Sequence, residues 1–206
     1  MPKTLAIYTD YVCPYCLLAE HVISKAIKDQ AVTIRWRPFE LRPHPAPTLR
    51  VEDPYLPEIW KRSVYPMAER LGVPIKLPRI SPQPRTTKAF EVFAMAEEQS
   101  LGHPFSIHVL KAFFQEEKDI GAPEVLADLG ARVGLDRDAV LNALTRGVYR
   151  ERHREALRHA QEDMTITSVP TIVVGKQIFK GVPPIDELQQ AITQAENNTD
   201  HSQNVY

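Results

Sequence analysis

The chain has 206 residues, 43% of them hydrophobic and 25% charged, and a chain of this size can bury a core without a disulfide or a metal to hold it folded. Lys and Arg total 25 against 26 for Asp and Glu, which excludes the strongly basic surface typical of nucleic-acid-binding or membrane-surface proteins. We therefore expect no nucleic-acid partner and no membrane association. The first ten residues lack the apolar run of a secretory signal, so we expect a cytoplasmic protein.

The first forty residues predict a β-α-β unit. Residues 4–9 form a short apolar run, and residues 32–39 alternate apolar and polar side chains with the period of a half-buried strand. Between them, apolar residues recur at spacings of three and four over 17–28, as in an amphipathic helix. Pro14 fits the first turn of that helix, where an N–H is not required.

The middle of the chain predicts helices and almost no strands. Five prolines in residues 42–57 indicate an extended connection, and a second proline-rich loop covers 74–84. Glycine and proline punctuation separates five predicted helices, at 57–71, 86–100, 104–117, 123–133 and 137–146. Their predicted common core consists of Phe90, Phe93, Val109, Leu110, Phe113, Phe114, Val125, Leu126, Leu129, Val140 and Leu144.

The last third returns to strands. A charged helix over 148–163 is expected to have a solvated face with pairs of opposite charge. The β-branched run 169–174 and residues 177–180 predict a hairpin around a turn at Gly175, followed by a helix over 185–195. The polar residues 196–206 predict a disordered tail.

Cys13 and Cys16 are the only cysteines, and they carry the strongest functional signal. A bridge between them closes too small a loop to stabilise the fold, so catalysis or metal binding explains the pair better. Unpaired N–H groups at a helix start favour a thiolate, which makes Cys13 the predicted nucleophile. Cys16 lies one turn further on and is the predicted resolving thiol. Pro14 and Tyr15 are expected to tune the pair and to contact substrate.

Zinc binding is the alternative for this spacing, since Cys-x-x-Cys is common in zinc sites. Two further ligands would be needed, and the sequence has no second Cys-x-x-Cys and no two histidines four residues apart. We therefore predict no metal.

A second candidate feature is the pair Val169 and Pro170. A proline that opens a β run is disruptive unless it lies at a strand edge or follows a cis bond. A cis Pro170 beside the cysteines would leave the Val169 backbone free to pair with an extended substrate, so both residues are predicted to bind substrate. An ordinary trans proline at a strand start is the alternative.

These features together resemble the DsbA-like thioredoxin superfamily, through residues 13–16 (CPYC) after a strand and 168–171 (SVPT) before a hairpin. Residues 10–16, 37–43, 118–120 and 133–136 narrow the resemblance to the FrnE-like branch of disulfide oxidoreductases and isomerases. The resemblance covers about residues 4–193.

The resemblance implies an α/β thioredoxin-like fold, with a β-α-β unit, a β-hairpin and a helix, interrupted by an inserted all-helical domain. Residues 1–50 and 148–195 would form the thioredoxin-like domain and 55–147 the insertion. It also implies a nucleophilic Cys13 and a cis Pro170. The expected partners are protein disulfides and thiols, with glutathione as a conceivable co-substrate and no other cofactor.

Two positions depart from the family pattern. Ile7 stands six residues before Cys13, where thioredoxin and DsbA proteins carry a buried acid. Asp10 is then a candidate proton acceptor for Cys16, with a turn or capping role as its alternative. The Pro14-Tyr15 dipeptide matches many glutaredoxins, which suggests a reduction potential on the order of −200 mV.

Two other functions remain open at this point. A glutathione-dependent isomerase or transferase of the kappa type shares the inserted helices, although such proteins usually carry serine at the position of Cys13. A holdase that binds unfolded clients and uses the cysteines as a sensor is the other. The sequence identifies neither the natural substrate nor the oligomeric state.

Overall fold

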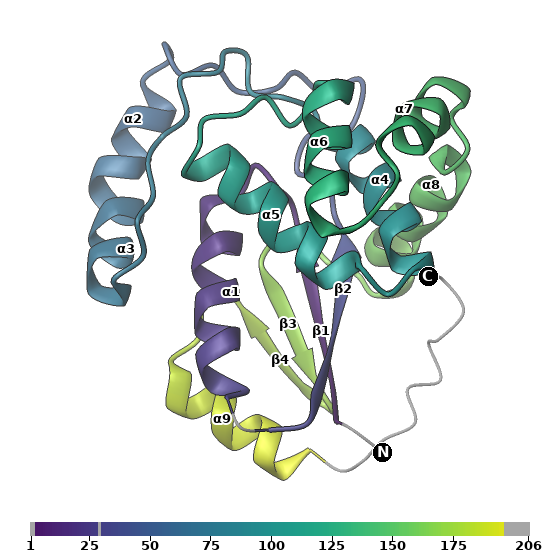
Figure 1. Cartoon of the computed structure of the whole chain (residues 1–206). Helices are drawn as coiled ribbons and strands as arrows, with labels where there is room; N and C mark the ends of the chain where they lie inside the picture. The colour runs from purple at the N-terminus through teal and green to yellow at the C-terminus, as the bar shows by residue number, and fades with distance from the viewer. Residues whose placement is uncertain (1–2, 29, 196–206) are drawn as a thin grey trace.

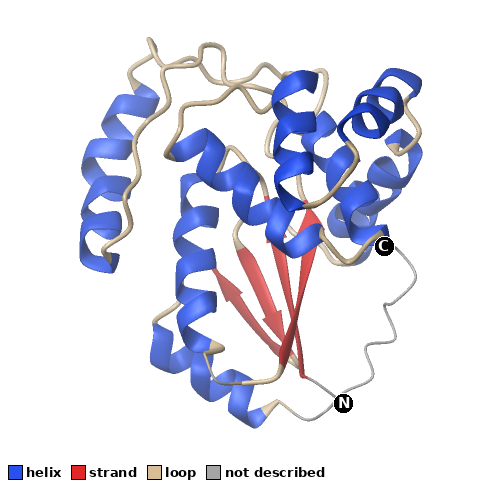
Figure 2. Ribbon diagram, in the orientation of Figure 1, coloured by secondary structure: helices blue, strands red, loops and turns tan. Residues whose placement is uncertain are grey.

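The computed structural model describes residues 3–28 and 30–195; the predicted disordered tail at 196–206 lies outside this range. A four-stranded sheet forms the lower part of the molecule in Figure 2, with helices around and above it. The strand order is β2-β1-β3-β4. The strands are β1 (Lys3–Thr9), β2 (Val32–Pro38), β3 (Thr171–Val174) and β4 (Gln177–Lys180).

The pairing of β1 joins the two ends of the chain. β1 runs parallel to β2, which places Ile7 opposite Trp36, and antiparallel to β3, which places Ile7 opposite Ile172. The helix α1 (Pro14–Ala26) connects β1 to β2 and contacts α9 (Ile185–Gln194) (Figure 1). The predicted α/β class, with a β-α-β unit, a hairpin and a final helix, is confirmed.

Helices fill the chain between β2 and β3, as predicted. They are α2 (Tyr55–Ile59), α3 (Tyr65–Leu71), α4 (Thr87–Glu98), α5 (Gly102–Phe114), α6 (Pro123–Val133), α7 (Arg137–Arg146) and α8 (Arg150–Arg158). One hydrophobic core runs from the sheet into these helices, so that Ile7, Trp60 and Phe113 belong to the same cluster. The division of the chain into two domains at 50/55 and 147/148 stays a prediction.

The predicted helical core is confirmed almost completely. Ten of its eleven residues are buried, and Val125 is partly buried against them. The helices that carry these residues contact one another, α4 with α5, α6 and α7, and α5 with α6. Spacings of three and four therefore identified the faces that pack together.

Several predicted boundaries were wrong at helix ends. The helix predicted over 86–100 ends at Glu98, and the one predicted over 104–117 begins at Gly102 and ends at Phe114. Ser100 and Glu117 have φ values of 60° and 53°. A right-handed helix does not continue through such a backbone conformation. The helix predicted over 17–28 covers 14–26. The strands and the last helix lie within one residue of their predicted limits, except that β3 begins at Thr171 rather than at 169.

Two predicted helices contain π-helical turns that the sequence did not indicate. The helix predicted over 57–71 begins at Tyr55 and changes to π geometry over Trp60–Val64, and α8 is followed by a π-helical turn over His159–Asp163. Pro66 lacks an N–H and its ring crowds the carbonyl four residues earlier, which disfavours regular α geometry just before it. The charged helix begins at Arg150 rather than at Val148.

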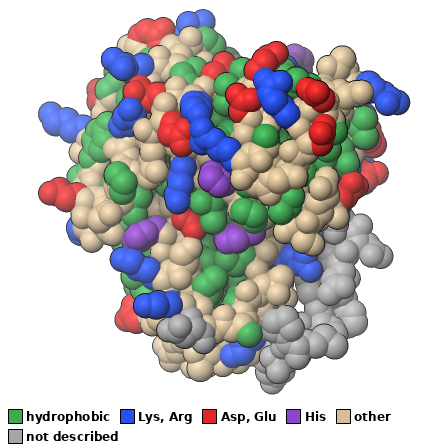
Figure 3. Space-filling model, in the orientation of Figure 1, with side chains coloured by type: hydrophobic (Ala, Val, Ile, Leu, Met, Phe, Trp, Pro, Cys, Tyr) green, Lys and Arg blue, Asp and Glu red, His purple; other side chains and the backbone are tan. Residues whose placement is uncertain are grey.

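Charged side chains of both signs are interspersed over the face shown in Figure 3. This distribution agrees with the near-neutral composition. Over residues 3–28 and 30–195, no helix is both long enough and apolar enough to cross a lipid bilayer.

Candidate active site

The two cysteines lie at the start of α1, just after the loop that follows β1. Cys13 caps the helix with an extended backbone (φ −90°, ψ 113°), and Pro14 occupies its first turn. The Cys13 amide donates to the Asp10 carbonyl, and the Cys16 amide donates to the Cys13 carbonyl, both at 3.0 Å. These bonds hold the two thiols one helical turn apart. The predicted arrangement of strand, turn, Cys-x-x-Cys and helix is confirmed.

Burial distinguishes the two sulfurs. Cys13 is 5% exposed and Cys16 is 0% exposed, and both carry free thiols. Burial raises the pKa of the Cys16 thiol well above its ordinary value, and the neighbouring Cys13 thiol raises it further. The Thr9 hydroxyl and the Asp10 amide lower this pKa, but by less than burial raises it. Cys16 therefore keeps its proton at neutral pH, and Cys13 is the less deeply buried of the two residues.

The loop before β3 meets the dithiol. The Cys13 thiol donates a hydrogen bond to the Val169 carbonyl at 3.5 Å, although the two residues are 156 positions apart. The Val169–Pro170 bond is cis, as the family resemblance implied. β3 begins at Thr171, two residues later than predicted, because Pro170 has no N–H to donate to a strand neighbour. The structure thus brings both predicted substrate-binding residues beside Cys13.

Tyr15 has a partner that the sequence did not reveal. Its hydroxyl donates to the Ser63 hydroxyl at 2.7 Å. Ser63 lies in the π-helical turn between α2 and α3. The Pro14-Tyr15 dipeptide is therefore hydrogen-bonded to the helical part of the chain that lies between β2 and β3 in the sequence. No local pattern signals this contact, because it joins residues 48 positions apart.

The family position for a buried acid is apolar here, and a different acid lies close by. Ile7 is fully buried in the core. Asp10 is buried as well, and its Oδ2 accepts a hydrogen bond from the Leu41 amide at 2.8 Å. Burial raises the pKa of Asp10 from 3.8 to about 6, while the Leu41 amide and other polar neighbours lower it less strongly.

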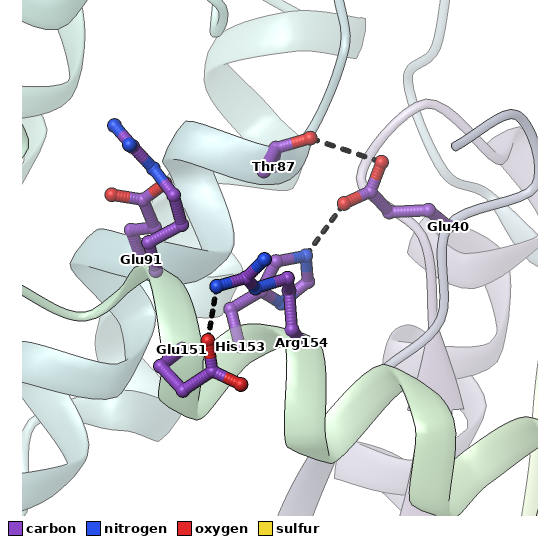
Figure 4. Close-up of polar contacts among 7 residues, drawn as sticks. Glu40, Thr87, Glu91, Glu151, His153 and Arg154 are labelled. Atoms are coloured by element: carbon purple, nitrogen blue, oxygen red, sulfur yellow. Dashed lines mark hydrogen bonds and ion pairs between the residues drawn. The ribbon is translucent and has the colours of Figure 1, made fainter. Parts of the chain in front are cut away.

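A buried polar cluster that the sequence analysis missed lies behind Asp10. His153 Nε2 and Glu40 Oε1 are 2.5 Å apart, and the Thr87 hydroxyl donates to Glu40 Oε2 at 3.1 Å (Figure 4). The His153 ring stacks on Phe90, which stacks on Tyr11 of the loop that leads to Cys13. The solvated face predicted for residues 148–163 holds for most of α8, but His153 is an exception because its side chain is buried.

A zinc site at Cys13 and Cys16 would need further ligands close to the two sulfurs. Within the part of the chain that the structure describes, no group of three or more His, Cys, Asp or Glu side chains is placed to hold a metal ion.

A pair of thiols one turn apart at a helix start, beside a four-stranded sheet of this topology, defines a thioredoxin-fold dithiol protein. Comparison with known families narrows this class. The model of the DSBA-like thioredoxin domain matches residues 4–193. The chain belongs to the DsbA-like thioredoxin family, whose members are thiol-disulfide oxidoreductases.

Individual relatives agree with this assignment. The chain is 42% identical over 194 residues to YwbO of Bacillus subtilis (strain 168), covering 94% of this chain and 97% of YwbO. Its fold is similar to that of a 2-hydroxychromene-2-carboxylate isomerase (TM-score 0.75, 20% identity, covering 93% and 95% of the two chains). It is also similar to the cytosolic disulfide reductase DsbM from Pseudomonas aeruginosa (TM-score 0.72, 17% identity, covering 92% and 97%).

Proposed function

We propose that this protein is a FrnE-like thiol-disulfide oxidoreductase or isomerase that exchanges disulfides with protein or small thiol substrates through Cys13 and Cys16. The observation that carries the proposal is the position of the two thiols: Cys13 caps the start of α1 and keeps 5% exposure, whereas Cys16 lies one turn behind it and is 0% exposed. Cys13, the less deeply buried residue at the helix start, is therefore assigned the first exchange with substrate, and Cys16 the second.

Reduction of a substrate proceeds in two exchanges. The Cys13 sulfur, in the partial positive field of the helix start, attacks one substrate sulfur, and the other substrate sulfur leaves as a thiolate with its bonding electron pair. The Cys16 sulfur then attacks Cys13 in the mixed disulfide and releases the first substrate sulfur. The substrate disulfide gains two electrons, and the dithiol becomes a Cys13–Cys16 disulfide. Oxidation of a substrate is the reverse sequence.

Four residues would shape the contact with substrate. Pro14 and Tyr15 flank the nucleophile on α1, and Val169 and Pro170 face it from the loop before β3. In the reduced protein the Val169 carbonyl accepts the Cys13 thiol hydrogen. When Cys13 becomes bonded to a substrate sulfur, that carbonyl is released, and it can then pair with an amide of an extended substrate segment.

Two finer features belong to the proposal. A cytoplasmic location and glutathione as a co-substrate are supported by the fold similarity to DsbM, a cytosolic disulfide reductase whose structure is also known with GSH. The Pro14-Tyr15 dipeptide suggests a reduction potential on the order of −200 mV. Equilibration with glutathione buffers measures this potential, and a value near the −120 mV of DsbA, about 80 mV higher, would contradict that part of the proposal.

Insulin reduction by dithiothreitol tests the main claim. The wild-type protein should accelerate precipitation of the insulin B chain, Cys13→Ser should abolish the acceleration, and Cys16→Ser should trap mixed disulfides at Cys13 without turnover. His21→Ser is a matched control on the same helix, outside the dithiol. Suppressed precipitation without faster reduction would contradict the proposal and favour the holdase.

A glutathione-dependent isomerase of the kappa type is the second candidate, favoured by the fold similarity to 2-hydroxychromene-2-carboxylate isomerase. Such chemistry needs one glutathione-activating group rather than a dithiol. Cys16→Ser separates the two functions: glutathione-dependent isomerase activity should survive the substitution, whereas turnover of disulfide substrates should collapse. An isomerase activity unaffected in Cys16→Ser, together with no dithiol turnover in the wild type, would replace the first proposal with the second.

A further inference from the structure

In the second exchange of the dithiol mechanism proposed above, on which this inference rests, the Cys16 thiol must give up its proton. Cys16 is fully buried and holds its proton at neutral pH. It must lose that proton to attack Cys13, because the thiolate is the nucleophile. Ile7, on the strand beneath the dithiol, has no group that takes up a proton. The acceptor is therefore a group other than residue 7.

Asp10 is tied to both cysteines through its backbone. Its amide faces the Cys16 sulfur, and its carbonyl accepts the Cys13 amide at 3.0 Å. The carboxyl group of the same residue is buried. Its Oδ2 is held by the Leu41 amide, whereas its Oδ1 has no partner at hydrogen-bond distance within residues 3–28 and 30–195. The residue whose amide faces the Cys16 sulfur thus carries a buried carboxyl oxygen that is available to accept a proton.

A small cavity connects this carboxyl group to polar surroundings. The cavity has a volume of about 50 Å³ and is lined by Asp10 and Val12 together with Thr48, Gln83 and Thr86. This volume exceeds the roughly 15 Å³ that a water molecule needs. Leu41, Leu49 and Pro84 make much of the wall apolar, but the polar side chains in the lining supply hydrogen-bond partners for water. Water in this cavity can exchange a proton between the Asp10 carboxyl group and solvent.

Charged groups from several elements surround Asp10. Glu40, from the segment after β2, lies near enough to raise the pKa of Asp10 by charge repulsion. Arg42 and Arg85 line the same cavity, but the Arg85 guanidinium donates to the carbonyls of Arg42 and Ala46.

Glu40 is fixed from its other side. His153 and Thr87 hold its two carboxyl oxygens (Figure 4). The Leu41 amide that binds Asp10 belongs to the next residue along the chain. One short segment therefore positions Glu40 and Asp10 together. Glu91 lies near enough to His153 for a charge interaction, and Arg150 and Lys88 are the cations that act on Glu91.

We infer that Asp10 takes up the proton that Cys16 releases during the second exchange, and that Glu40, held by His153, is the positioning residue that tunes Asp10 for this role. In the step, the Cys16–Cys13 bond forms and the bond from Cys13 to the substrate sulfur breaks. The substrate sulfur leaves as a thiolate with the electron pair. The Cys16 proton passes to the Asp10 carboxylate and then to solvent through the cavity.

Stopped-flow reaction of the reduced protein with Ellman's reagent separates the two steps. The first thionitrobenzoate is released by Cys13 at a rate proportional to reagent concentration, and the second by Cys16 at a rate independent of it. In the wild type, the second rate should rise with pH through an inflection near 6, where Asp10 becomes ionised. Asp10→Asn should slow the second release at least ten-fold at pH 7, remove the inflection, and leave the first rate within about two-fold.

Two further variants keep the test decisive. Glu40→Gln removes the charge that opposes ionisation of Asp10, so the inflection should move to lower pH; this comparison decides the matter if Asp10→Asn does not fold. Thr9→Val removes the polar side chain whose hydrogen bond lowers the pKa of Cys16. A second release that is unchanged in Asp10→Asn, an inflection that stays in place in Glu40→Gln, or the full effect in Thr9→Val would overturn the inference. A wild type without a second release would instead contradict the dithiol mechanism itself.

Discussion

Replacing Asp10 by Asn should change how the stability of the protein depends on pH, because this carboxyl group is buried. Its pKa is raised from 3.8 to about 6 in the folded protein. Between these two pH values the folded state holds a proton that the unfolded state has lost, so the contribution of Asp10 to stability is greatest below pH 3.8 and falls until about pH 6. At 1.36 kcal/mol per pH unit, the loss amounts to about 3 kcal/mol.

Urea unfolding followed by circular dichroism measures this effect. The free energies of unfolding of wild type and Asp10→Asn are compared from pH 3.5 to pH 7.5. Asn has no proton to lose, so the difference between the two proteins should move by about 3 kcal/mol in favour of the variant across this range. Asp138→Asn reports the effect of removing one negative charge from an exposed position. A difference that stays constant with pH for Asp10→Asn would refute the argument from burial.

Three other substitutions test the packing and the hydrogen bonds described above. Phe113→Ala should lower the free energy of unfolding by about 3–5 kcal/mol, since it opens a cavity in the fully buried core; a loss below about 1 kcal/mol in urea would contradict this placement. Asp136→Ala should cost about 1 kcal/mol, because the Asp136 carboxylate accepts the Ala139 amide at the start of α7; the Asn variant, which keeps an acceptor, should restore most of it. Tyr15→Phe and Ser63→Ala should each destabilise the protein, and a double-mutant cycle by thermal unfolding should show a coupling of about 1 kcal/mol. Additive effects would show that the two hydroxyls do not depend on each other.

The fold could be predicted to a large extent because its signals are local. The alternation in residues 32–39 and the helical spacing in 86–100 each arise from the contact of one element with the core. Gly134 ends α6 with a φ of 108°, a conformation that favours glycine, and this residue had marked the boundary in the sequence. The π-helical turns were not predictable in the same way, since a single extra residue in a turn barely alters the spacing of apolar side chains.

The residues of the candidate site also differ in whether they could be predicted from local sequence. Cys13, Cys16 and the residues between them are contiguous, so a motif reveals them. The pairs Asp10 with Leu41 and Glu40 with His153 join residues 31 and 113 positions apart. Such pairs depend on how the helices pack, and no periodicity in one chain encodes them. A buried histidine in a helix that is otherwise strongly charged was therefore interpreted as part of a solvated face.

The antiparallel pairing of β1 with β3 has a consequence for the order in which the chain folds during its synthesis. β1 leaves the ribosome first, but its second neighbour in the sheet is not made until Val174. Closing so long a loop is costly in entropy and slows folding. Throughout this interval the nascent chain carries Cys13 without the Val169 carbonyl that binds its thiol in the folded protein. The same topology that shelters the dithiol in the finished molecule leaves it open to oxidation until translation reaches Val169, 156 positions after Cys13.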